Sequence, residues 1–247
     1  MSSISLKTAT NLRTNQESVA GNKSLYNVAF IAALLSAISW IAFVIGSMGL
    51  PDISTISDPL EYFLAYQEAW TPYMLYSWGG VLGTLLSIPY ILAFYIAMKA
   101  HGPLILLALI TALIGAVFTL IGFFETLTLM YIHLPYALEA SPEQLQVIRN
   151  AATVVEGVFE VPWFLGSFLI FGLGVGLLAY YGLRSATGPK WVNVVGLLGG
   201  FSGVVWLNLF LPFIRPFSTI LIILNILTVF IWSIGLSLAL VRSGSNT

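Results

Sequence analysis

Six long apolar segments follow one another along the chain, and shorter polar segments separate them. Their approximate bounds are 26–49, 73–98, 103–132, 161–183, 191–211 and 218–241. At 1.5 Å per residue, a helix over each segment is long enough to cross a hydrocarbon core of ~30 Å. The pattern therefore predicts an all-α fold, a polytopic membrane bundle of six transmembrane helices.

The polar ends of the chain divide it into three parts. Residues 1–24 are rich in Ser, Thr, Asn and Gln, and we expect a disordered N-terminal tail because such a segment buries too little apolar surface to order. Residues 25–242 form the predicted six-helix transmembrane domain, and residues 243–247 a C-terminal tail. The first apolar segment is as long as a full span, so we expect an uncleaved helix there rather than a signal peptide.

Two of the connections contain helix-start signals. The segment 58–61, Asp-Pro-Leu-Glu, has an N-cap, a proline at the first helical position and a glutamate two residues later. It predicts a short outer-surface helix between spans 1 and 2. The segment 141–144, Ser-Pro-Glu-Gln, predicts a second helix that continues into span 4. That helix would be roughly 63 Å long, so we expect it to tilt or to kink at Pro162.

The distribution of Lys and Arg predicts the orientation. If the N-terminal tail is cytoplasmic, seven of the nine basic residues lie on the cytoplasmic side. They are Lys7, Arg13, Lys23, Lys99, Arg184, Lys190 and Arg242. Only Arg149 and Arg215 then lie in outer segments. By the positive-inside rule both termini are predicted to be cytoplasmic, in a multi-pass protein of the cell (plasma or inner) membrane.

Composition supports the membrane class and narrows the chemistry. The chain is 58% hydrophobic and 8% charged, whereas a soluble domain has about 25% charged residues. Its net charge of −1 predicts no binding to nucleic acid, which leaves the lipid bilayer as the expected partner. There is no cysteine, and the two histidines, His101 and His133, fall on opposite sides of the predicted bundle. We therefore expect no haem and no cofactor.

Glycines four residues apart predict places where helices approach closely. The pairs are Gly79 with Gly83, Gly172 with Gly176, Gly196 with Gly200, and Gly199 with Gly203.

A group of polar residues is predicted to meet near the outer boundary of the bilayer. Arg149, Thr153, Glu156 and Glu160 have the spacing i, i+4, i+7 and i+11, so they share one helical face that runs into span 4. Four further candidates reach a similar depth on other segments: Glu125, His133, Asn208 and Arg215. Charged groups at membrane depth are costly and usually face a cavity, a partner or a pathway.

Three interpretations of this polar cluster stay open. The first is a structural network between helices, and the second is a proton or cation pathway. The third is a metal or hydrolytic site that uses His133 with three glutamates. The last lacks the Glu-x-x-His, His-Glu-x-x-His and Gly-x-Ser-x-Gly patterns. Unpaired carboxylates in a cavity would favour the pathway, whereas paired carboxylates would favour a structural network. A position of His133 close to two carboxylates would favour an enzyme.

Among specific functions we favour transport of a small solute or ion through an outward-facing acidic pocket. The first alternative is a membrane-embedded enzyme that acts on a lipid-like substrate, and the second is a non-catalytic scaffold or partner-binding subunit.

The second half of the chain contains a series of loose motifs. The segment 176–185 ends in Arg-Ser, the segment 189–191 is Pro-Lys-Trp, and the segment 196–200 is rich in glycine. In this order, and with the segment 122–125 (Gly-Phe-Phe-Glu), the chain resembles a family of six-span bacterial integral membrane proteins that is catalogued only as a domain of unknown function. The resemblance implies six helices and a prokaryotic membrane. It implies no activity and no site residues.

Overall fold

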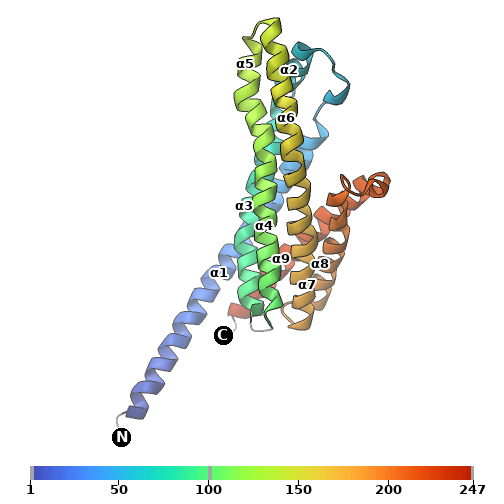
Figure 1. The fold of residues 1–247 in the computed structure, drawn as a ribbon. Coiled ribbons are helices and arrows are strands. Elements are labelled where there is room, and N and C mark those ends of the chain that lie inside the picture. Colours follow the sequence, from blue (N-terminus) through green and yellow to red (C-terminus); the bar gives the residue numbers. More distant parts are fainter. Residues whose placement is uncertain (1–2, 100–101, 246–247) are drawn as a thin grey trace.

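The computed structural model describes residues 3–99 and 102–245, and this part of the chain is helical with no β-strand (Figure 1). Six helices are long and apolar enough to cross a membrane. They are Lys23–Thr55, Trp70–Met98, Leu104–Leu138, Pro142–Arg184, Lys190–Leu207 and Pro212–Ser243. Each matches one predicted apolar segment, so the prediction of an all-α fold with six helices able to cross a membrane is confirmed.

The α-helices are α1 (Ser3–Met48), α2 (Pro59–Glu68), α3 (Trp70–Met98), α4 (Leu104–Thr128), α5 (Leu134–Leu138), α6 (Pro142–Ser167), α7 (Val175–Arg184), α8 (Lys190–Ser202) and α9 (Ser218–Ser245). The π-helical segments Leu129–His133 and Phe168–Gly174 join α4 to α5 and α6 to α7. The 3-10 helices are Ile53–Thr55, Gly203–Leu207 and Pro212–Phe217. Helix α1 includes most of the segment expected to be a tail, and the disorder of that segment stays a prediction.

Both predicted helix starts are confirmed. The Asp58 carboxylate accepts hydrogen bonds from the backbone N–H groups of Leu60 (2.8 Å) and Glu61 (2.9 Å), which caps α2. Ser141 and Gln144 form a capping box at the start of α6.

The helix that starts at Pro142 continues into span 4, as predicted. It passes through Pro162 without ending and keeps its α-helical pattern to Ser167. The departure from that pattern comes later, in the π-helical segment Phe168–Gly174. A π-helical segment inserts an extra residue into a turn and changes which side chains face a neighbour.

Glycines bring α4 into close contact with α6 and with the π-helical segment that follows it. A Cβ atom added to any of three glycines would lie far too close to the facing helix. The contacts are Gly115 with the Ile170 nitrogen (2.5 Å), Gly166 with the Thr119 nitrogen (2.3 Å) and Gly122 with the Trp163 Cβ (2.3 Å). The two residue numbers in each pair add up to the same value, as in a regular antiparallel register. Extending this register by three residues brings Glu125 of α4 opposite Glu160 of α6.

The predicted glycine pairs also mark contacts. A Cβ added to Gly200 would lie 2.4 Å from the Gly176 Cα, and one added to Gly203 would lie 2.5 Å from the Gly172 Cα. Gly79 approaches the backbone of α1 in the same way, at 2.6 Å from the Phe43 nitrogen. Small residues thus set the spacing between several pairs of helices.

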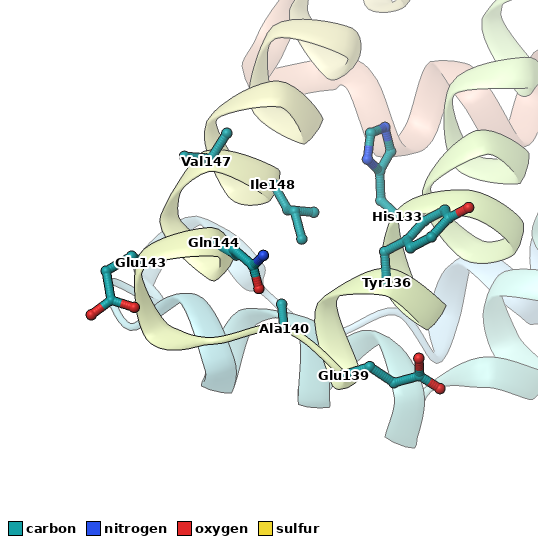
Figure 2. A pocket seen from close by; sticks show the side chains of 8 residues that line it. All are labelled: His133, Tyr136, Glu139, Ala140, Glu143, Gln144, Val147 and Ile148. Atoms are coloured by element: carbon teal, nitrogen blue, oxygen red, sulfur yellow. The ribbon is translucent and has the colours of Figure 1, made fainter.

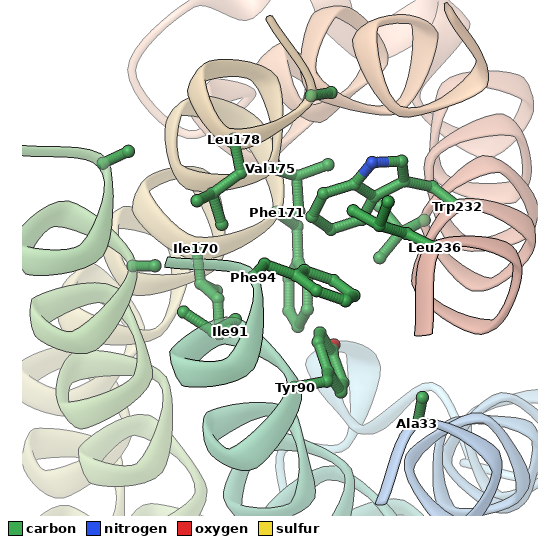
Figure 3. Close-up of a cluster of buried hydrophobic side chains, with 14 of the residues drawn as sticks. Ala33, Tyr90, Ile91, Phe94, Ile170, Phe171, Val175, Leu178, Trp232 and Leu236 are labelled. Atoms are coloured by element: carbon green, nitrogen blue, oxygen red, sulfur yellow. The ribbon is translucent and has the colours of Figure 1, made fainter. Parts of the chain in front are cut away.

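The side chains form two separate cores. The larger one joins all six spans, and Figure 3 shows Phe94 of α3 and Trp232 of α9 packed there edge to face, with ring centroids 5.0 Å apart. The smaller one lies at the α2 end of the molecule. Its buried members are Tyr62, Phe63, Tyr66, Tyr73, Leu129, Met130, Leu134, Ala137, Leu145 and Ala152. We call the part built around this second core, residues 59–68 and 129–160, the head.

The lengths of the helices indicate that the head extends beyond the thickness of a bilayer. The continuous helix Pro142–Arg184 has 43 residues and is roughly 60 Å long, about twice the ~30 Å hydrocarbon core. Lys190–Leu207 has only 18 residues, about 27 Å, which matches that core. Figure 1 shows α2, α5 and the first half of α6 well beyond the connection between α8 and α9. The start of α1 and the end of α9 lie at the opposite end.

A matched pair of substitutions in α6 tests the glycine contact. Gly166→Ala places a methyl group against the backbone of α4, whereas nothing lies within 4 Å of a Cβ added to Gly157. Both changes gain the same helix propensity, so their difference measures the contact. We expect Gly166→Ala to lower the free energy of unfolding by about 1–3 kcal/mol and Gly157→Ala to leave it unchanged or raise it by up to ~1 kcal/mol. Unfolding in detergent micelles measures both, and equal stability of the two variants would contradict the prediction.

Candidate functional site

Three glutamates meet in one cavity where the head joins the spans. The cavity has a volume of about 280 Å³, and Glu125 of α4 lines it together with Glu156 and Glu160 of α6. The antiparallel register of α4 and α6 produces this meeting, because it brings the first turns of span 4 beside the end of span 3. The sequence prediction placed these three carboxylates at one level, and the structure brings them together.

The three carboxylates have no partner among the residues that the structure describes. Within the part of the chain that the structure describes, no hydrogen bond or ion pair reaches Glu125, Glu156 or Glu160. Glu160 is exposed, whereas Glu125 and Glu156 are partly buried. No Lys, Arg or His is among the described residues that line the cavity. The result is an acidic cavity with uncompensated carboxylates and an accessible edge at Glu160.

Aromatic side chains form much of the cavity wall. They are Tyr66 of α2, Tyr73 and Tyr76 of α3, and Trp163 and Phe164 of α6. The rings of Tyr66 and Tyr73 stack with centroids 4.5 Å apart. Burial raises the pKa of Tyr66, so its hydroxyl group stays neutral and offers a dipole rather than a charge.

Packed aromatic rings lie beside the cavity on the side of the bundle. Tyr76, in the wall, lies edge to face with Phe123 at 5.8 Å between ring centroids. Phe123 in turn packs against Trp40 at 6.4 Å, and Trp40 against Phe171 at 5.0 Å. These rings, except Tyr76, are fully or almost fully buried. A layer of packed aromatic rings therefore lies between the cavity wall and the bundle interior.

Arg149 belongs to the predicted stripe but not to the cavity. Its guanidinium group donates hydrogen bonds to the backbone carbonyls of Ile56 and Ser57 and lies 4.8 Å from the ring centroid of Tyr62. It thereby fastens the segment before α2 to α6. Thr153 is exposed, and its hydroxyl donates to the Arg149 carbonyl at 3.1 Å. Both residues therefore have structural contacts in place of contacts with the glutamates.

His133 lies in a different pocket. This groove of about 670 Å³ runs between the α5 segment and the start of α6, near the tip of the head (Figure 2). Glu139 and Glu143 also border it, but Figure 2 shows their carboxylates directed away from His133. The site of His133 with three glutamates is therefore not assembled. Among the described residues, no three His, Cys, Asp or Glu side chains are placed to hold a metal ion.

The last two candidates lie in the connection between α8 and α9. The Arg215 side chain donates to the Asn208 carbonyl at 3.4 Å, and neither residue lines the acidic cavity. Asn225, at a similar depth, is buried: it accepts from the Trp206 indole at 2.9 Å and donates to the Gly199 carbonyl at 2.8 Å. It holds α8, α9 and the Gly203–Leu207 turn together and has no free polar group to offer.

Sequence reasoning favoured an interfacial belt for the aromatic residues at the start of α3, with an aromatic ligand cage as the less supported alternative. Tyr73 and Tyr76 have the pattern of an interfacial aromatic belt, and only their packing shows that they line the cavity. The cap at Asp58, which starts the helix bearing Tyr66, was the one local signal that pointed there.

Comparisons of the chain with protein-family models, with curated proteins and with solved structures found no match.

Replacing Arg149 tests whether it fastens the segment before α2. Arg149→Ala removes two charge-assisted hydrogen bonds, each worth about 1.5–3 kcal/mol. We expect amide hydrogen exchange in residues 50–58 to become at least tenfold faster. Arg149→Lys should have a smaller effect, because an ammonium group lacks the fork that serves two carbonyls. Arg215→Ala, far from this segment in the chain, is the control, and unchanged exchange in Arg149→Ala would refute the assignment.

Proposed function

We propose that the protein transports a small positively charged solute or ion, the proton included, and that the acidic cavity is its outward-facing binding site. The observation that carries this proposal is a cavity with three carboxylates that, among the described residues, are unpaired and have no basic residue beside them in the cavity wall. Such a cavity attracts cations and disfavours anions.

The lack of pairing argues against a purely structural role. A structural network satisfies its buried polar groups, because an unpaired one costs free energy. Carboxylates that share a cavity also repel one another when ionised. A bound cation or proton would relieve both costs, which supports a binding role for Glu125, Glu156 and Glu160.

Transport further requires that this layer of aromatic rings open. The rings of Phe123, Trp40 and Phe171 separate the cavity from the rest of the bundle. In this proposal the structure corresponds to the outward-facing state, and the rings part when the site opens toward the other side. Rearrangements of packed helices of this kind are common in proteins that gate access to a site.

The orientation that we propose has the head outside the cell membrane and both termini in the cytoplasm. Lys99, Arg184 and Lys190 all lie at the ends of spans away from the head, as the positive-inside rule requires. The resemblance to six-span bacterial proteins suggests a bacterial membrane.

The absence of cysteine allows a direct test of this orientation. We expect a membrane-impermeant maleimide to label Gln146→Cys, in the head, in intact cells. Ser243→Cys, near the end of α9, should react only after the membrane is permeabilised. Both residues are exposed, so both positions can react once the reagent reaches them. The opposite labelling pattern would reverse the orientation.

Flux measurements in proteoliposomes test the transport role. Flux is measured under an imposed pH gradient and, separately, under a gradient of the transported cation. We expect Glu125→Gln and Glu156→Gln to slow flux roughly tenfold or more, since each variant loses a charge at the site. Glu160→Gln should have a smaller effect because Glu160 is exposed. Glu139→Gln, which borders the other pocket, is the matched control. Unchanged flux in all three cavity variants would rule out this function.

A further inference from the structure

We infer that the acidic cavity recognises an organic ammonium ion, a positively charged nitrogen that carries small alkyl groups. This inference rests on the proposed function and names the class of its substrate. The three carboxylates would attract any cation. The evidence for an organic ammonium ion therefore comes from the walls of the cavity.

The first argument is the composition of the wall. Three tyrosines, a tryptophan and a phenylalanine line the same cavity as the three glutamates. Aromatic faces attract alkylated ammonium groups through the ring quadrupole, and cages of aromatic side chains are a common way to bind them. An inorganic cation gains little from such walls, because it needs a close shell of oxygen ligands.

The second argument is the size of the cavity. A volume of about 280 Å³ is far larger than the space between the ligands of a dehydrated metal ion, and it approaches the lower limit of small-molecule sites, about 300 Å³. The carboxylates are also too dispersed to form a metal site: among the described residues, no three acidic or imidazole side chains are placed to hold one. The site therefore fits a compact organic cation better than a metal ion.

The protein itself already contains one contact between a cation and a tyrosine ring. The Arg149 guanidinium lies over the ring of Tyr62, one helical turn before Tyr66 in α2. The two tyrosine rings are 5.1 Å apart. Tyr62 thus contacts the Arg149 cation in the head. The neighbouring rings of Tyr66 and Tyr73 extend this row of tyrosines into the cavity.

The test compares cations on the purified full-length chain in lipid nanodiscs. Tetraethylammonium, ethylammonium, Na⁺ and K⁺ are titrated at constant ionic strength, and binding is measured by calorimetry. We expect both ammonium ions to bind, with dissociation constants at least tenfold lower than those of Na⁺ or K⁺. Glu125→Gln should weaken ammonium binding by tenfold or more, whereas Glu139→Gln should not change it.

Aromatic recognition is tested at Tyr73. Tyr73→Leu removes the ring and should weaken ammonium binding about 5- to 30-fold, the range that a desolvated cation–π contact provides. Tyr73→Phe keeps the ring and should restore affinity. If Tyr73→Leu does not fold, the selectivity of the unmodified chain for ammonium ions over Na⁺ and K⁺ decides the question.

The outcomes separate this inference from the proposed function. Binding of Na⁺ or K⁺ that depends on Glu125, without binding of ammonium ions, would overturn the substrate class and leave cation transport standing. Ammonium binding that is unaffected in folded Tyr73→Leu would overturn aromatic recognition. Proton flux that depends on the glutamates, with no cation bound, would also overturn the substrate class. No binding and no flux would overturn both proposals.

Discussion

The backbone contact between α4 and α6 is the constraint on which the rest of the structure depends. Where glycines let two helices touch, neither can slide without a clash, so the register between them is discrete. That register places Glu125 across from Glu160. It also fixes the two long helices that continue into the head, since α5 extends α4 and α6 begins there. The head, its core and the acidic cavity at its base all follow from one set of glycine contacts.

The thickness of the bilayer gives the cavity its place. Helices of 35 and 43 residues cannot be contained in a hydrocarbon core that the 18 residues of Lys190–Leu207 already cross. In the proposed orientation the excess forms the head, and the glutamates would lie where the long helices leave the membrane. A charge costs much less at this boundary than at the bilayer centre. Carboxylates can therefore stay unpaired here, with the rings around Phe123 between them and the interior of the bundle.

The spans, the helix starts and the level of the glutamates could be predicted from the sequence, because their signals are local. The six spans follow from apolar length, and the starts of α2 and α6 follow from Asp58 and Ser141. The level of Glu125 relative to Glu160 follows from counting residues. Depth, however, does not say which faces meet. Arg149 is eleven residues before Glu160, about 16 Å along the helix, so a shared helical face did not mean a shared site.

The aromatic walls show a second limit of sequence reasoning. An aromatic residue at the end of a span has the same local pattern whether it faces lipid headgroups or a cavity. Tyr73 and Tyr76 line the cavity only because α2 folds back over α3 and because the register of α4 and α6 opens a space beside them. Such facts depend on contacts between segments far apart in the chain, and periodicity within one segment does not contain them.

The contacts of Arg149 bear on why the carboxylates are unpaired at all. Arg149 is the cation nearest to Glu156 along the chain, seven residues or about 10 Å away, and a salt bridge to it would have been the simplest way to neutralise the cavity. Its guanidinium is instead committed to the carbonyls of Ile56 and Ser57 and to the ring of Tyr62. The head is thus held together by the same cation that could have compensated the site. Local rules of stability are typically broken at functional sites and offset elsewhere, and an acidic cavity whose closest basic residue is engaged in the neighbouring loop fits that pattern.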